Sequence, residues 1–156
     1  MKTVLLIVML LGIFATGAFA LDHPAMHQMI MEQGGPKADT RTELKMPESM
    51  KVMHKGIMRN HLDAISKIAA ALAGHELSRA ADIATKDLGW SDAQEKMCAM
   101  FGDLAGDKDF LALGKAMHLK ADDLAADARK GDRDKALADL SQLIRHCNAC
   151  HERFRH

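Results

Sequence analysis

The chain has 156 residues, a length that favours a single domain. Its 21 basic and 21 acidic residues balance, so the sequence lacks the basic excess that would indicate nucleic-acid binding. Residues 1–20 are typical of a secretory signal peptide: Lys2 precedes an apolar run from Val4 to Phe14, and Ala18-Phe19-Ala20 is a small-x-small cleavage site. The run is short for a membrane span, so we expect cleavage after Ala20, a periplasmic location and no membrane segment in the mature chain.

Residues 21–43 are expected to form a flexible, irregular arm, because the stretch is polar and contains Gly34-Gly35-Pro36. The arm is also rich in thioether and imidazole side chains, which are ligands that Cu(I) prefers. They are His23, Met26, His27, Met29 and Met31. A metal-handling role for this arm is therefore one hypothesis, and a tail that happens to be rich in methionine is the other.

Apolar spacing after the arm predicts four helices and no strands. The first helix begins near Pro47 and ends at Gly74, and the second runs from about Leu77 to Leu88 and ends at Gly89. Apolar side chains that follow one another at intervals of four, three, four and three residues predict a narrow buried face on the first helix. That face consists of Met58, Leu62, Ile65, Ala69 and Leu72.

Residues 89–108 are expected to be a connection packed over the core, with one helical turn or more between Gln94 and Phe101. Cys98 is expected to be a small buried apolar residue, and a disulfide-linked dimer is the alternative. The third helix begins near Lys108 with Asp107 as its cap, and it ends at Gly131. Asp132 then caps the fourth helix. Its predicted inward face contains Leu137, Leu140, Ile144, Cys147 and His151.

This pattern predicts an all-α domain over residues 44–156: an antiparallel four-helix bundle that holds a cofactor between its helices, near the C-terminus of the last helix. The cofactor is indicated by Cys147-x-x-Cys150-His151. Two thiols at this spacing can each add to a vinyl group of a porphyrin, and the adjacent imidazole can bind the iron, which is the pattern of haem c attachment. A redox or zinc Cys-x-x-Cys motif would need a βαβ setting or two further ligands at matching spacing, and neither is evident.

The tail Cys147-Asn148-Ala149-Cys150-His151-Glu152-Arg153-Phe154-Arg155 resembles the Cys-x-x-Cys-His-x-x-Phe-Arg ending of class II c-type cytochromes, the cytochrome c-prime superfamily. Residues 68–74, Ile-Ala-Ala-x-Leu-x-Gly, also resemble the end of that family's first helix. The resemblance implies one covalently bound haem c, with His151 as an axial ligand and Met58 at the distal position. It is greatest to the methionine-ligated low-spin branch, and it also implies a possible homodimer.

The resemblance leaves two roles open for Met58. It either binds the iron in a one-electron carrier or only fills the distal side, as in the branch that binds nitric oxide or carbon monoxide. The reserve sixth ligands are His61, His54 and Met53, and His118 is expected at the surface or in an interface.

Arg153 and Arg155 are candidates to pair with haem propionates, and Phe154 is expected to pack on the haem or on the first helix. The favoured function is electron transfer without substrate turnover, so the protein is not expected to be an enzyme. Its expected partners are other periplasmic redox proteins.

Overall fold

The computed structural model describes residues 23–35 and 38–156, so the signal peptide predicted for residues 1–20 lies outside the described residues. The chain divides into two units, residues 1–40 and residues 41–156. In the first unit, His23–Glu32 form helix α2, and the irregular conformation expected for these residues is wrong. Pro24 lies in its first turn, where a missing N–H is tolerated, and Gly34 and Gly35 follow its end with φ of 97° and 64°.

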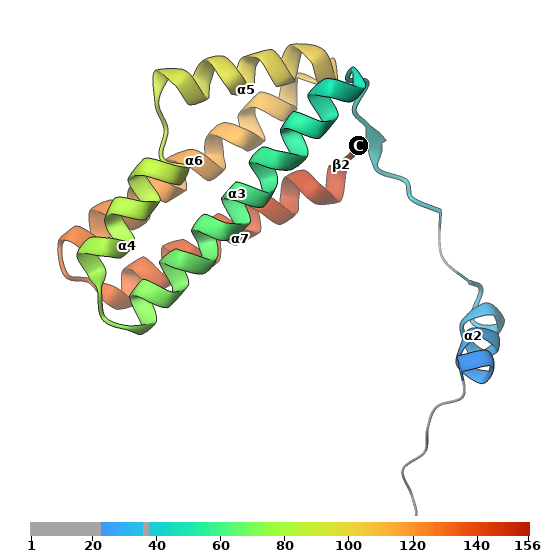
Figure 1. Ribbon diagram of the computed structural model, residues 1–156, viewed down its shortest axis with the longest axis horizontal. Coiled ribbons are helices and arrows are strands. Elements are labelled where there is room, and N and C mark those ends of the chain that lie inside the picture. Colours follow the sequence, from blue (N-terminus) through green and yellow to red (C-terminus); the bar gives the residue numbers. More distant parts are fainter. Residues whose placement is uncertain (1–22, 36–37) are drawn as a thin grey trace, which may run out of the picture. The chain divides into compact units, whose positions relative to one another are not determined.

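The second unit is mostly helical, as predicted (Figure 1). Its elements are β1 (Thr42–Glu43), α3 (Glu48–Ala73), α4 (Leu77–Ile83), the π-helical η1 (Ala84–Leu88), α5 (Asp92–Ala105), α6 (Lys108–Arg129), α7 (Arg133–Arg153) and β2 (Phe154–Arg155). The strands β1 and β2 pair in parallel and were not predicted, because two-residue strands from opposite ends of the unit have no local signal. None of the described helices is both long enough and apolar enough to cross a bilayer.

Side-chain caps define three of the helix starts. Asp107 accepts a hydrogen bond from the N–H of Asp109 at 2.9 Å, and Asp132 accepts one from Lys135 at 2.9 Å, which confirms both predicted caps. Ser91 likewise accepts one from the N–H of Gln94 at 3.3 Å. The helix predicted between Gln94 and Phe101, of one turn or more, is therefore confirmed, but it is longer than this range. It is the 14-residue helix α5, so the expectation that most of residues 89–108 form a connection is wrong.

Close packing around Gly89 ends the predicted second helix where it was expected to end. A Cβ atom at this position would lie 2.5 Å from the carbonyl oxygen of Thr85 and 2.7 Å from Oδ1 of Asp122. Because the oxygen of Thr85 belongs to the helix backbone and cannot move aside as a flexible side chain could, only glycine fits at this position.

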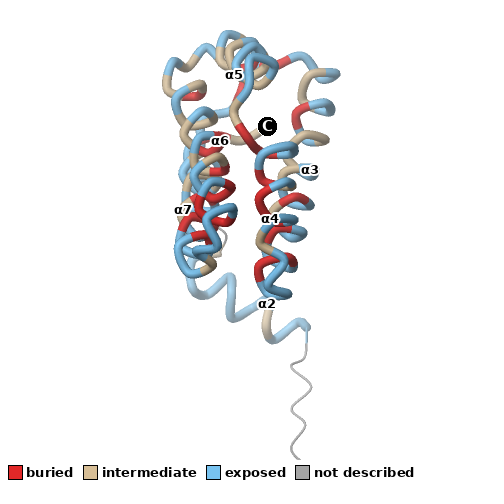
Figure 2. The backbone as a smooth tube through the Cα atoms, turned by 90° about the vertical axis from the view of Figure 1, so that its left-hand side faces the viewer, coloured by how far each residue is buried: buried red, intermediate tan, exposed pale blue. Residues whose placement is uncertain are grey.

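The helices bury their apolar side chains in two separate clusters. The first cluster joins α3, α4, η1, α6 and α7, and its fully buried large side chains are Ile68, Leu72, Leu88, Leu124 and Leu143. The second cluster contains Leu44, Met46, Phe101, Phe110 and Phe154. Figure 2 shows the buried positions along the helices.

The predicted buried faces of the first and last helices are partly wrong. On α3, Leu62 is 67% exposed and Ala69 is also exposed, whereas Ala64, Ile68 and Ala71 are buried. On α7, Leu140 is buried as predicted, but Leu137 and Ile144 are exposed. The adjacent residues Ala136 and Leu143 are buried in their place. On α6, the apolar spacing of the sequence predicts a buried stripe, and most of it is confirmed. Five of its members are buried and one, Leu113, is half-buried; the buried members are Phe110, Met117, Ala121, Leu124 and Ala128.

The first cluster can be tested with two leucines of α6. Leu124 is fully buried and Leu119 is 44% exposed. We expect Leu124→Ala to lower the free energy of unfolding by about 2–5 kcal/mol, because it removes buried methyl groups and leaves a cavity. Leu119→Ala should change it by no more than about 0.5 kcal/mol. Urea denaturation followed by circular dichroism measures both, and equal effects would contradict this core.

Candidate functional site

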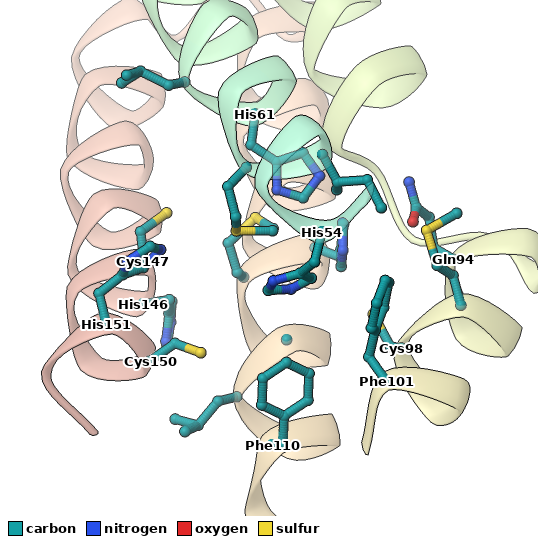
Figure 3. A pocket seen from close by; sticks show the side chains of 18 of the residues that line it. His54, His61, Gln94, Cys98, Phe101, Phe110, His146, Cys147, Cys150 and His151 are labelled. Atoms are coloured by element: carbon teal, nitrogen blue, oxygen red, sulfur yellow. The ribbon is translucent and has the colours of Figure 1, made fainter. Parts of the chain in front are cut away.

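A cavity of about 500 Å³ lies among α3, α5, α6 and α7 (Figure 3). This volume falls within the roughly 300–1,000 Å³ typical of small-molecule and cofactor sites. Cys147, Cys150, His151 and Met58 all line it, so the structure brings the four predicted iron and attachment residues to one site. Most of the remaining lining is apolar and includes Ile57, Leu62, Ile65, Met97, Leu113 and Met117.

The cavity lies where the two apolar clusters meet. Cys147 packs against the first cluster and Cys150 packs against the second. On α3, Ile65 packs against the first cluster and Ile57 packs against the second. Both thiols are half-buried, and Figure 3 shows them on the cavity side of α7.

Burial keeps these thiols protonated. It raises the pKa of Cys147, and it raises the pKa of Cys150 to about 11, with a further contribution from the neighbouring Cys147. Redox-active Cys-x-x-Cys motifs have the opposite property, a lowered thiol pKa that generates thiolate. The surroundings of this pair are therefore unlike those of a disulfide oxidoreductase.

His151 lines the cavity from the last turn of α7, but its side chain is exposed. The prediction that it points into the interior is therefore only partly met. Its carbonyl oxygen accepts a hydrogen bond from Nη1 of Arg41 at 3.1 Å, which ties this turn to the segment before α3.

Met58 is half-buried on α3, and two reserve ligands, His54 and His61, line the same cavity one turn to either side. The third reserve, Met53, is 42% exposed and does not line the cavity. His54 is buried, with its Nδ1 3.1 Å from Nε2 of His156 and its ring 4.6 Å from that of Phe101.

His118, expected at the surface, is only 2% exposed, so that prediction is wrong. Its Nδ1–H donates a hydrogen bond to the carbonyl oxygen of Leu88 at 2.6 Å. The carbonyl can only accept, so this bond fixes the tautomer and leaves Nε2 with a lone pair. Its ring lies nearly perpendicular to the ring of His61, at a centroid distance of 5.4 Å, and both residues line the cavity.

The basic residues of the tail pair with carboxylates. Arg153 lies 3.0 Å from Asp107 and 2.7 Å from Asp109, at the start of α6, and Arg155 lies 3.1 Å from Glu43. These pairs are an alternative to the propionate contacts predicted from the sequence. Phe154 is buried in the second cluster, with its ring 5.4 Å from that of Phe110.

Sequence reasoning missed the cavity position of Cys98, which lies on α5. This half-buried thiol also lines the site, 3.5 Å from where a Cβ atom would stand on Gly114, and burial raises its pKa. The S-x-x-Q spacing of Ser91 and Gln94, which is a helix-start signal, could have located α5 and hence Cys98.

The donor set of the cavity fits a covalently attached haem. It offers two thiols one helical turn apart, several imidazoles and the thioether of Met58 around an apolar volume. Within residues 23–35 and 38–156, no group of three or more His, Cys, Asp or Glu side chains is placed to hold a metal ion.

The cavity histidines predict acid sensitivity. Burial and neighbouring imidazoles lower the pKa of His54 and of His61 to about 4. The unfolded chain takes up these protons near pH 6.5, whereas the folded chain does so only near pH 4. The stability that these two neutral histidines contribute is therefore fully present above about pH 6.5 and is lost as the pH falls toward 4.

Urea denaturation at pH 7 and pH 5 measures this loss. His54→Phe should reduce the difference in the free energy of unfolding between pH 7 and pH 5. The control His27→Gln changes an exposed residue of α2 and should leave this difference unchanged. If the His54 variant lost as much stability between pH 7 and pH 5 as the wild type, His54 would not be a cause of the acid sensitivity.

Comparisons of this chain with protein-family models, with curated proteins and with solved structures found no match.

Proposed function

We propose that this chain is a monohaem c-type cytochrome of the class II kind and that it carries single electrons. The observation that supports this most directly is the cavity, because residues from the two ends of the domain meet there. Cys147, Cys150 and His151 come from the last helix and Met58 comes from the first. Neither the thiol pair alone nor the methionine alone would indicate this function.

The proposal includes a finer fold. α3, α4 continued by η1, α6 and α7 would be the four helices of an antiparallel bundle, and α5 would be an addition between the second and third. Short connections support this arrangement, since residues 74–76 separate α3 from α4 and residues 130–132 separate α6 from α7. Connections of this length favour antiparallel neighbours.

Cys147 and Cys150 would hold the haem through thioether bonds, and His151 and Met58 would bind its iron. The bound haem supplies a reversible one-electron change at the iron. The apolar side chains of α3, α5 and α6 would exclude water from its surroundings, and a methionine ligand favours a higher potential than a second histidine. No side chain is needed as an acid or base.

The proposed setting is the periplasm, after export and cleavage of residues 1–20. Covalent haem attachment requires free thiols outside the cytoplasm, which agrees with the signal-like start of the chain. The proposed partners are other periplasmic redox proteins, which would bind through small and transient interfaces.

Replacing the motif cysteines tests the attachment. The full chain is expressed in a bacterium that exports it and can attach haem c, and a denaturing gel is then stained for haem. The wild-type chain should keep its haem through denaturation, and the double variant Cys147→Ser, Cys150→Ser should lose it.

Cys98→Ser is the matched control, since Cys98 also lines the cavity but lies outside the motif. It should keep the haem. A wild-type chain without bound haem, or a double variant that retains it, would overturn the proposal.

Replacing Met58 tests the sixth ligand. If its sulfur binds the iron, the reduced wild-type protein has a low-spin visible spectrum, and Met58→Ala shifts it to a high-spin spectrum that responds to carbon monoxide. Met53→Ala is the control, because Met53 is exposed and does not line the cavity.

Two other results would redirect this assignment. A low-spin spectrum that survives Met58→Ala would identify His61 or His54 as the ligand. A wild-type spectrum that is already high-spin and shifts with carbon monoxide would favour the gas-binding alternative, with Met58 only filling the distal side.

A further inference from the structure

We propose that helix α2 carries a binding site for a soft monovalent metal ion, Cu(I), formed by His23, Met26 and His27. These residues lie at positions i, i+3 and i+4 of the helix His23–Glu32. Side chains at these spacings are neighbours on one face of an α-helix, so the two imidazoles and the thioether form a triangle within one turn. This geometry follows from the helix and was absent from the irregular arm that the sequence predicted.

The three side chains are accessible to an ion. His23 and His27 are exposed and Met26 is half-buried. Within residues 23–35 and 38–156, none of the three has a hydrogen-bond or ion-pair partner. The one side-chain hydrogen bond of α2 joins Gln28 to Glu32 at 2.9 Å, on a different face of the helix.

The chemistry of the triangle favours a soft ion. Two histidines four residues apart on a helix are a known metal-binding arrangement, seen in zinc proteases. The triangle itself consists of two imidazoles and a thioether, without a carboxylate. The thioether shifts the preference toward Cu(I), because carboxylates suit hard cations and thioethers suit Cu(I). Met31 is excluded from the site, since its Sδ lies 3.5 Å from where a Cβ atom would stand on Gly35, beyond the end of the helix.

Metal binding would also stabilise this helix. α2 has ten residues and buries none of them, and a helix this short is marginal in water without tertiary packing. An ion that bridges His23 and His27 would link successive turns of the helix. Binding and helix formation at α2 are therefore coupled, as in other small metal sites.

The test is a titration of the ¹⁵N-labelled full chain with Ag(I), a diamagnetic and redox-stable substitute for Cu(I), followed by NMR. The haem-loaded protein carrying Cys98→Ser is used, so that no free thiol competes. If the chain binds no haem, the variant with all three cysteines replaced by serine is used instead, and the result does not depend on the proposed electron-transfer function. Amide shifts should change first and most within residues 23–32.

Single replacements identify the ligands. His23→Ala, His27→Ala and Met26→Leu should each weaken Ag(I) binding about tenfold or more, which is the lower range of losses seen even for outer-shell changes. Met29→Leu is the matched control and should bind like the wild type. Although Met29 follows Met26 by three residues, it lies two residues after His27, and residues two apart on a helix do not face each other, so Met29 cannot complete a site with both imidazoles. The proposal would be overturned if Ag(I) shifted mainly amides outside residues 23–32 or if the histidine variants bound it as tightly as the wild type. Equal losses of affinity in Met26→Leu and Met29→Leu would also overturn it.

Discussion

The separation of the apolar core into two clusters is the constraint on which the site depends. One cluster joins α3, α4, η1, α6 and α7, and the other joins α5, the start of α6 and the two ends of the unit. Each cluster fixes the helices on one side of the cavity, so the walls between them are held apart without filling it. Cys147 and Cys150 pack on different clusters, which fixes the turn of α7 between them at both ends. Under the proposed function, the two thiols would react with two points on one rigid haem, and holding them in place beforehand would reduce the entropy lost in that reaction.

The second cluster is closed by the chain's last residues. β2 pairs with β1, and the N–H of Leu44 donates a hydrogen bond to the carbonyl oxygen of Arg155 at 2.9 Å. Asp107 has two functions here, because it caps α6 and also binds Arg153. The end of α7 is thereby attached both to the start of α6 and to the segment before α3. Each exposed ion pair adds little stability by itself. Together with the buried ring of Phe154, however, they determine where the last turn of α7 lies.

Local signals predicted much of this fold, and long-range packing accounts for the errors. Asp107 and Asp132 were identified as caps because capping depends on residues two or three positions away. The buried face of α3 was misplaced because Met58 and Leu62 line the cavity, whereas Ala64 and Ile68 belong to the first cluster. Periodicity identifies the apolar side chains of a helix but does not show what they face. The burial of His118 could not be predicted, since its partner Leu88 is on another helix. At the site, the motif identified the thiols directly, but the cavity that brings them to Met58 required the fold.

The cavity also shows a consistent electrostatic pattern. Burial lowers the pKa of His54, His61 and His118 and raises the pKa of Cys98, Cys147 and Cys150. All six shifts favour the uncharged form of the side chain. The common cause is the low polarity of the walls, which disfavours any net charge inside them. The same walls would disfavour the extra positive charge of ferric iron relative to ferrous iron. Under the proposed function, burial and the methionine ligand would therefore act in the same direction and raise the reduction potential.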